Sequence, residues 1–107
     1  MSYKIEAIPP FDRQVKKLAK KYPSLKEDLI RLTNDLTKNP FKGSSLGNNC
    51  YKIRINITSK KRGKSGGARV ITHIYIQKQK VFLLTIYEKS SKTDISDKEL
   101  KDLLKFI

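Results

Sequence analysis

The sequence predicts an α+β fold in which helices pack on one face of a mostly antiparallel sheet. Three β-rich stretches follow one another between residues 50 and 87 and are separated by two polar turns. Two stretches with apolar residues at helical spacing precede them, and a third follows them. Strands that are grouped beside helices, rather than alternating with them, are typical of an α+β domain.

Composition predicts a small domain without disulfides. The 107 residues, 37% of them hydrophobic, predict one domain over 1–107 with a modest core. One cysteine and one histidine exclude an internal disulfide and cannot build a metal site by themselves, so we expect neither a metal nor another cofactor. No apolar run is long enough to cross a bilayer, and the first residues lack the apolar core of a signal peptide. We therefore expect a cytoplasmic protein without a membrane partner.

The first half of the chain is predicted to form a strand and a helical hairpin. Residues 3–8 alternate weakly between apolar and polar side chains, as in a short strand. A proline pair then ends this strand. Helical spacing then predicts helices over 10–22 and 24–38, and Ser24–Glu27 has the pattern of a capping box. The short turn between the helices predicts an αα-hairpin. The apolar residues of the predicted inner faces are Phe11, Val15, Leu18, Ala19, Tyr22, Leu25, Leu29, Leu32 and Leu36.

The second half is predicted to supply three strands and a last helix. A loop rich in Gly, Ser and Asn over 41–49 precedes strands over 50–57, 69–76 and 81–87. The last of these strands is apolar on both faces, so we expect it to be central or to have one face covered by a partner. A second capping box opens the final helix at Ser96. The expected element order is β-α-α-β-β-β-α.

Positive charge is concentrated in the predicted sheet. The formal net charge is +14, and residues 50–92 contain eleven Lys or Arg against one acidic residue, Glu88. A pI near 10.0 points to a polyanionic partner, such as RNA, DNA, an anionic membrane surface or an acidic protein. Because the excess is local, it is a candidate electrostatic footprint rather than a general aid to solubility.

Cations on neighbouring strands form the main candidate site. Lys52 and Arg54 lie on the polar face of their predicted strand, and Arg69 opens the next strand. Lys89 and Lys92 follow the last strand. If the strands pair as a hairpin, these cations converge on one surface, where Arg binds phosphate bidentately and Lys adds a compact charge. The alternative is that they are solvated residues that prevent edge-to-edge pairing of the sheet.

The long turn between the first two of these strands holds four more cations beside a glycine pair. We expect this tip to contact the phosphate backbone of RNA or DNA without reading its sequence. For a catalytic role, the simpler explanation of a plain solvated turn is preferred. The four cations are Lys60, Lys61, Arg62 and Lys64.

Other polar residues of the strands have ordinary structural explanations. His73 lies mid-strand between apolar neighbours and is better explained as a structural histidine than as a general base. Cys50 is expected to be a small buried or half-buried residue. Tyr75 and Tyr87 have the chemistry to stack on bases, although strand tyrosines usually lie in the core or at its rim.

Several motifs of the chain stand in an order found in one group of bacterial proteins. The first helix runs from Phe11-Asp12 to Tyr22-Pro23, the run Cys50–Arg54 begins a strand, and an arginine opens the next strand. These features and the element order resemble RelE. Residues 63–70 and 87–95 are more similar to the HigB branch of the same RelE/ParE toxin superfamily. The resemblance covers nearly the whole chain and lies in the order of all the motifs together.

The resemblance implies that the whole chain is a RelE-like toxin domain from a type II toxin–antitoxin pair. RelE and HigB toxins are metal-independent endoribonucleases that cut mRNA in the ribosomal decoding site and leave a 2′,3′-cyclic phosphate. By position, Lys52 and Arg54 match a basic pair of RelE. Arg69 matches its phosphate-binding arginine, and Lys89 falls near a second catalytic arginine. The C-terminal catalytic tyrosine of RelE has no match here, because Ile95 stands near its place.

Such a reaction needs positioning and charge stabilisation more than a strong base. Arg69 is expected to bind the non-bridging oxygens, and Arg54 to orient the backbone. Lys52 or Lys89 is the candidate acceptor of the 2′-OH proton. Tyr87 is the nearest candidate for the role of the missing tyrosine. The sequence shows no obvious base-reading pocket, so the ribosome is expected to supply most of the specificity.

The resemblance also implies partners. They are a cognate antitoxin that is a small helix-turn-helix protein, the ribosome with its mRNA, and operator DNA bound through the toxin–antitoxin complex. Two alternatives remain open: a ParE-like toxin that poisons DNA gyrase, and a nucleic-acid-binding co-repressor without a reaction. The four cations matched to RelE favour the nuclease over the gyrase poison.

Overall fold

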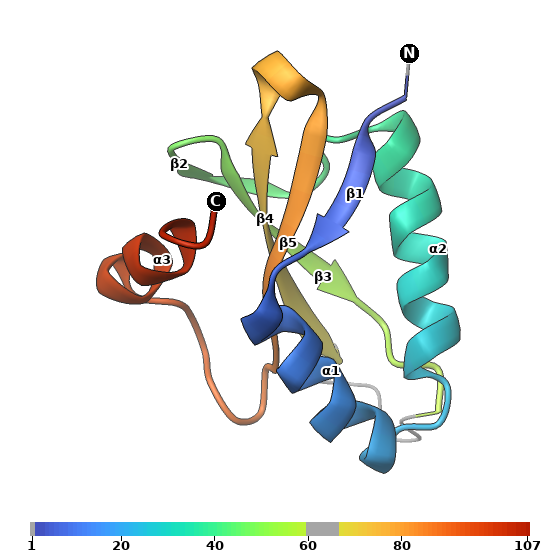
Figure 1. Ribbon diagram of the computed structural model, residues 1–107. Helices are drawn as coiled ribbons and strands as arrows, with labels where there is room; N and C mark the ends of the chain where they lie inside the picture. The colour runs from blue at the N-terminus through green and yellow to red at the C-terminus, as the bar shows by residue number, and fades with distance from the viewer. Residues whose placement is uncertain (1, 60–66) are drawn as a thin grey trace.

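The computed structural model describes residues 2–59 and 67–107. Within these residues, five strands form one sheet and three α-helices pack against it (Figure 1), which confirms the predicted α+β fold. The elements are β1 (Lys4–Ala7), α1 (Pro9–Lys21), α2 (Leu25–Lys38), β2 (Ser44–Gly47), β3 (Cys50–Ile55), β4 (Ala68–Tyr75), the 3₁₀ turn η2 (Ile76–Lys78), β5 (Lys80–Glu88) and α3 (Asp97–Leu104).

The strand order is β1-β5-β4-β3-β2, so β5 has a strand on each side. This confirms the interior position predicted from its apolar faces. β1 pairs with β5 in parallel, with Lys4 opposite Lys80, whereas the other neighbouring strands are antiparallel. The sheet therefore joins the first strand of the chain directly to the last.

Residues 44–47, predicted to belong to a loop, form the edge strand β2 beside β3. The prediction was wrong because Leu46 is the one large apolar residue of this segment, so the segment shows no alternation. The signal lies in the next two residues, Asn48 and Asn49, whose φ angles are 53° and 59°. A two-residue hairpin turn of type I′ needs positive φ at both positions, and Asn tolerates it better than most residues.

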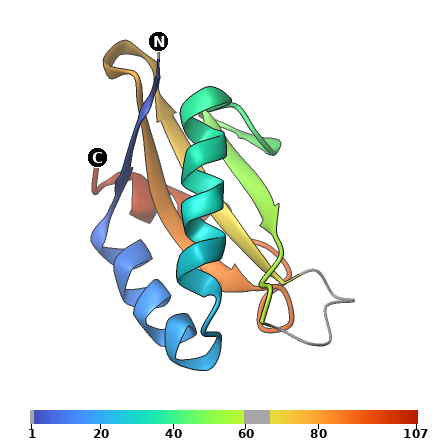
Figure 2. The ribbon, with the colours of Figure 1, turned by 90° about the vertical axis from the view of Figure 1, so that its right-hand side faces the viewer.

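The helices α1 and α2 cover one face of the sheet, as the sequence predicts (Figure 2). All four leucines predicted for the inner face of α2 are buried, Leu25 and Leu36 completely, and α1 buries Phe11. The capping box predicted for α2 is wrong, because the Ser24 side chain bonds to Asp28 and to the segment after β3. The sheet residues buried on this face include Ile53, Val70, Ile74, Val81, Leu83 and Ile86.

The helix α3 covers the opposite face of the sheet, whereas the sequence predicted all the helices on one face. The reason lies in β5: Val81 and Leu83 point toward α1 and α2, whereas Phe82 and Leu84 point the other way and need their own cover. Leu100 of α3 supplies it. The capping box predicted at the start of this helix is confirmed. Among the described residues, no helix is both long and apolar enough to cross a membrane.

Candidate functional site

The residues predicted to carry chemistry meet in one row across three strands. In the register of the sheet, Arg54 of β3 lies opposite Arg69 of β4, and Arg69 lies opposite Tyr87 of β5. Residues that are opposite each other in antiparallel strands share a face, and neighbouring strands are about 4.8 Å apart. We call Arg54, Arg69 and Tyr87 the cross-strand row. It lies on the face that α3 covers in part.

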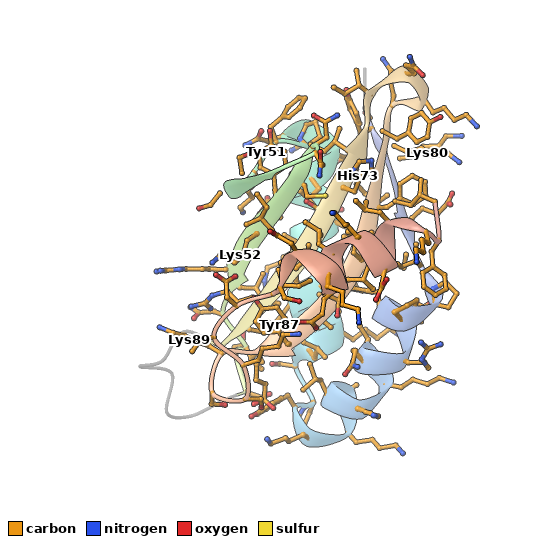
Figure 3. All side chains as sticks on the ribbon, turned by 90° about the vertical axis from the view of Figure 1, so that its left-hand side faces the viewer. Tyr51, Lys52, His73, Lys80, Tyr87 and Lys89 are labelled. Carbon is orange, nitrogen blue, oxygen red and sulfur yellow. The ribbon has the colours of Figure 1, made fainter. Side chains whose placement is uncertain are left out.

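Two more predicted cations flank the cross-strand row. Lys52 stands two residues before Arg54 on β3 and therefore points to the same face. Lys89 stands two residues beyond Tyr87, just after β5. Figure 3 shows Lys52, Tyr87 and Lys89 toward one end of this face, with His73 toward the other. The structure thus brings together all the residues predicted to be catalytic.

The row combines an exposed cation with a buried one. Arg54 is exposed, whereas Arg69 is only 4% exposed and its Nη1 donates to the carbonyl of Ala68 at 3.2 Å. The guanidinium of Arg69 therefore lies beneath the surface that a ligand meets. A buried charge is screened less by salt than an exposed one. Arg69 is thus placed to set the potential of this surface, while Arg54 is placed for direct contact.

Tyr87 is 9% exposed, and its hydroxyl has no hydrogen-bond partner among the described residues. Burial raises the pKa of Tyr87 above its ordinary value of 10.0, and the carboxylates of Asp94 and Glu99 raise it further, while the charge of Arg69 opposes them. Tyr87 is therefore a neutral phenol at pH 7. It can donate or accept a hydrogen bond, but it is not a base.

Two carboxylates pair with cations of the site: Asp94 from the segment between β5 and α3, and Glu99 from α3 itself. Lys52 Nζ lies 3.5 Å from Asp94 Oδ1, and Lys92 Nζ is paired with Glu99 Oε2. Lys92 Nζ also lies 5.3 Å from the centroid of the Tyr87 ring. A backbone N–H and the charge of Lys52 lower the pKa of Asp94, and the hydrogen bond from Lys92 lowers that of Glu99. Because such exposed ion pairs contribute little stability, a phosphate group can replace either carboxylate at low cost.

His73 and Cys50 contact each other away from the row. They are opposite in the register, and Cys50 Sγ lies 3.5 Å from His73 Nδ1. Cys50 is fully buried, as predicted, and burial raises the pKa of its thiol to about 11. Burial lowers the pKa of His73 below its ordinary 6.5, against an opposing hydrogen bond to the backbone of Asn48. His73 is four residues from Arg69, or roughly 13 Å along the strand, so it lies outside the row.

The predicted backbone-binding tip lies outside the described residues, but the segment that leads into it is anchored to α2. Asp28 is buried and accepts hydrogen bonds from the backbone N–H of Thr58 at 3.0 Å and from its hydroxyl at 2.6 Å. The backbone N–H of Ser59 donates to Ser24 Oγ at 2.7 Å. The residues of the tip that fall outside are Lys60, Lys61, Arg62 and Lys64.

Asp28 is the structural residue that sequence reasoning missed. Burial raises its pKa, but the hydrogen bonds from Thr58 and Ser24 and the charge of Arg31 outweigh burial, so the pKa of this carboxyl lies below its ordinary 3.8. A signal was present in the sequence. Asp28 stands three residues after Leu25 on the apolar face of α2, where a carboxylate must have partners.

Glu88, the one acidic residue of the basic region 50–92, faces away from the cross-strand row. It is 7% exposed, accepts a hydrogen bond from the Tyr22 hydroxyl at 2.5 Å, and lies 3.2 Å from Lys21 Nζ. Neighbours along a strand point to opposite faces, so Glu88 lies behind Tyr87. Its hydrogen bond to Tyr22 and its ion pair with Lys21 therefore bind α1 to the sheet.

Comparison with known proteins matches this architecture. The family model for the RelE toxin of the RelE/RelB toxin–antitoxin system matches residues 11–106. The chain belongs to the RelE toxin family. Among solved structures it is similar to free E. coli RelE carrying two arginine-to-alanine substitutions, at 19% identity and a TM-score of 0.64, with 100% of this chain and 99% of that chain covered.

Two toxin–antitoxin complexes are also similar to this RelE-family chain. The intact E. coli RelBE complex matches at 19% identity and a TM-score of 0.63, with 81% of this chain and 96% of that chain covered. The RelBE2 complex from Mycobacterium tuberculosis matches at 16% identity and a TM-score of 0.60, with coverage of 82% and 99%. At these identities the structures establish the shared RelE fold. The HigB-like character of 63–70 and 87–95 stays a prediction.

Two further observations concern the chemistry of this RelE-family chain. Ile95, near the place of the RelE tyrosine, is half-buried and packs with the apolar residues under α3, so it fills space and carries no polar group. Among residues 2–59 and 67–107, no group of three or more His, Cys, Asp or Glu is placed to hold a metal ion.

Proposed function

We propose that this RelE-family toxin cuts mRNA on the ribosome and thereby inhibits translation. The observation that supports this most directly is the cross-strand row with Lys52 and Lys89 beside it. Strands about 4.8 Å apart space the cations so that they can bind one phosphate and hold the backbone on either side. Membership of a toxin family supports an attack on a cellular target.

In the proposed reaction, the ribose 2′-OH attacks the adjacent phosphorus. The O2′–P bond forms and the P–O5′ bond breaks, which leaves a 2′,3′-cyclic phosphate and a 5′-hydroxyl. Lys52 or Lys89, acting as the neutral amine, takes the 2′-OH proton, and the leaving O5′ takes a proton from water or from the other lysine in its ammonium form. The reaction uses no metal, because the cations of the site stabilise the charge of the phosphoryl oxygens.

The geometry suggests a division of roles. Arg54, which is exposed, orients the backbone, and Arg69 stabilises negative charge from beneath as it grows in the transition state. Tyr87 keeps its proton and acts through its ring or its hydroxyl. Lys92 and the cations of the tip bind the RNA backbone or ribosomal RNA without contributing to the chemical step.

An antitoxin is the second proposed partner. Two of the structures similar to this chain, E. coli RelBE and M. tuberculosis RelBE2, are complexes of toxin with antitoxin. A chain of formal charge +14 is best silenced by an acidic or amphipathic segment that covers the row. We expect a small helix-turn-helix antitoxin, with operator DNA bound mainly through it, and a cytoplasmic site of action where ribosomes are found.

Induction of the chain without an antitoxin tests the proposal. Growth should stop, and mapping of transcript 5′ ends should show new ends within ribosome-engaged mRNA. Purified chain should cut mRNA on programmed ribosomes, and the upstream fragment should end in a 2′,3′-cyclic phosphate. Loss of DNA supercoiling while transcripts remain intact would instead support the gyrase poison.

A pair of matched variants distinguishes the contribution of the site to cleavage from the contribution of positive charge in general. Arg54→Ala and Arg13→Ala remove the same charge from an exposed arginine, but Arg13 lies on α1, away from the row. Cleavage should fall at least about tenfold more in Arg54→Ala than in Arg13→Ala, since only Arg54 contacts the bound backbone in the proposed site. Equal losses would mean that the row is not the place of cleavage.

A further inference from the structure

A cavity beside the cross-strand row has features that the proposed cleavage chemistry does not use. It has a volume of about 490 Å³ and lies between the start of α1, β5 and α3. Ligand pockets commonly measure about 300–1,000 Å³. Tyr87 and Lys92 line it and also belong to the site. The cavity could not be predicted from the sequence, because its walls come from segments that are far apart in the chain.

The floor of the cavity carries an unsatisfied polar group. Tyr87 is nine-tenths buried, at 9% exposure, and its hydroxyl has no hydrogen-bond partner in the described part of the chain. A buried hydroxyl without a partner is unfavourable. The oxygen itself is inaccessible to solvent, so a ligand gains affinity by displacing the atoms that now close it off and supplying the missing partner.

One wall of the cavity is a face of the C-terminal helical segment that joins carboxylates to an aromatic ring. Glu99, Asp102, Leu103 and Phe106 are spaced at i, i+3, i+4 and i+7, and all line the cavity. Phe106 is 52% exposed, so it is accessible to a ligand. The wall thus offers an aromatic ring beside two carboxylates, each in an exposed ion pair that a ligand can replace at low cost, Glu99 with Lys92 and Asp102 with Lys105.

We infer that this cavity binds the base of a nucleotide next to the scissile phosphate, and that it favours adenine, cytosine and guanine over uracil. Carboxylates accept hydrogen bonds from exocyclic amino groups, which those three bases carry and uracil lacks. The single N–H on uracil's pairing edge is flanked by carbonyl oxygens, which a carboxylate repels. An aromatic side chain at the wall can stack on the base. The identity of the ligand as RNA rests on the proposed function.

The position of the cavity favours a base over an antitoxin side chain. The row Arg54, Arg69, Tyr87 crosses the sheet in steps of about 4.8 Å, and the cavity begins at its last member. A backbone held on the row by its phosphate therefore leads the neighbouring nucleotide directly to the cavity. Lys92, at its rim, lies where it can hold the next phosphate.

Binding of uncleavable RNA tests the inference without relying on cleavage. Four labelled trinucleotides, with 2′-O-methyl groups throughout and only the central base varied, are titrated with purified chain in a fluorescence anisotropy assay at low salt. The uracil trinucleotide should bind about tenfold more weakly than the other three, as expected for the loss of one good hydrogen-bonded contact. Asp102→Asn and Phe106→Ala should each reduce this preference to about threefold or less.

Two controls exclude unfolding and loss of general charge. Asp97→Asn neutralises a carboxylate on the first turn of the same helix that does not line the cavity, and it should keep the full preference. Tyr87→Phe removes a hydroxyl that makes no hydrogen bond within the described residues, so its thermal midpoint should not fall while its nucleotide affinity does. A purely structural role for Tyr87 would give the opposite pattern.

The outcomes separate this inference from the proposed function. Equal binding of all four trinucleotides overturns the inference, even if programmed ribosomes are cleaved. Discrimination against uracil without cleavage on programmed ribosomes supports the cavity and overturns the proposed reaction. If Phe106→Ala weakens binding of the antitoxin encoded beside this chain but leaves trinucleotide binding unchanged, the cavity belongs to the antitoxin and the inference is wrong.

Discussion

The two faces of the sheet treat their polar groups differently. On the face under α1 and α2, the buried carboxylates of Asp28 and Glu88 are held by hydrogen bonds from neighbouring elements. On the face under α3, the carboxylates of Asp94 and Glu99 are exposed and pair with lysines. Each face also has one buried hydroxyl without a partner in the described residues, Thr72 on the first face and Tyr87 on the second. The first arrangement stabilises a fold. The second leaves groups that a ligand can satisfy.

The difference also appears in how the helices are attached. α2 buries four leucines along its length, whereas α3 is anchored by one fully buried residue, Leu100, with Leu103 and Leu104 half-buried. Because the layer of α1 and α2 is tightly packed and supplies most of the stability, the layer of α3 can be packed more loosely. The comparison predicts that substitutions on the first face change stability and that substitutions on the second change function.

The largest expected effect is on the first face. Leu36 is completely buried, so Leu36→Ala should lower the free energy of unfolding by about 2–5 kcal/mol. Leu104→Ala on α3 removes a half-buried side chain and should cost roughly 1 kcal/mol. Urea denaturation of both variants measures the two costs. Equal losses would contradict the proposed difference between the faces.

The next effect is on the second face. Arg69→Ala should lower the single-turnover cleavage rate on programmed ribosomes about 100-fold or more, because the lost charge acts most strongly on the transition state. Arg69→Lys keeps the charge and should restore only part of the rate, since an ammonium group lacks the planar guanidinium that donates to the carbonyl of Ala68 and positions that charge. Circular dichroism must show that both variants are folded. Cleavage by Arg69→Ala at the parental rate would place the reaction elsewhere.

Asp28 links pH to stability. Its pKa is lower in the folded chain than its ordinary 3.8, so its ionised form adds stability above that value, and this stability is lost as pH falls through the folded pKa. Asp28→Asn should therefore cost about 2 kcal/mol at pH 7 and progressively less below about pH 4. Urea denaturation over this pH range gives the difference. A cost independent of pH would show that the charge of Asp28 is not responsible.

Asp94→Asn tests whether a carboxylate competes with RNA. It releases Lys52 from an exposed ion pair, so the unfolding free energy should change by less than about 0.5 kcal/mol. Affinity for a short RNA at low salt should rise about twofold to fivefold, and the gain should shrink at high salt. Glu6→Gln, which breaks a similar exposed pair with Lys80 between β1 and β5, is the control and should leave RNA affinity unchanged within error.

The smallest effect concerns His73, which lies outside the row. His73→Gln should leave the cleavage rate and its dependence on pH between 5.5 and 7.5 essentially unchanged, because this histidine lies outside the row and pairs with Cys50 instead. Cleavage rates across this pH range provide the measurement. A loss of about 100-fold would instead be the behaviour of a general base.

Most of the fold follows from residue patterns, and the exceptions have physical reasons. The leucine spacing of α2 and the alternation of β3 predict their elements because each has one buried face. β2 was missed because its signal is the positive φ of Asn48 and Asn49 rather than apolar content. The side on which α3 packs is decided by tertiary contacts that local patterns do not encode.

The candidate site is less completely predictable. Strand alternation places Lys52 and Arg54 on one face, but the register that aligns Arg54, Arg69 and Tyr87 depends on pairing across a long turn. The burial of Arg69 and the cavity beneath α3 depend on packing between distant segments. No pattern along the chain could reveal them.

The parallel pairing of β1 with β5 has a kinetic consequence. Ile5 pairs with Val81, so the ladder between them closes a loop of most of the chain. Loops of this kind make folding slow, on the order of milliseconds to seconds for small domains rich in non-local pairs. During synthesis, the row also has no Tyr87 until β5 has been made. A ribosome that translates this chain therefore finishes nearly all of it before the nascent toxin can acquire its complete site.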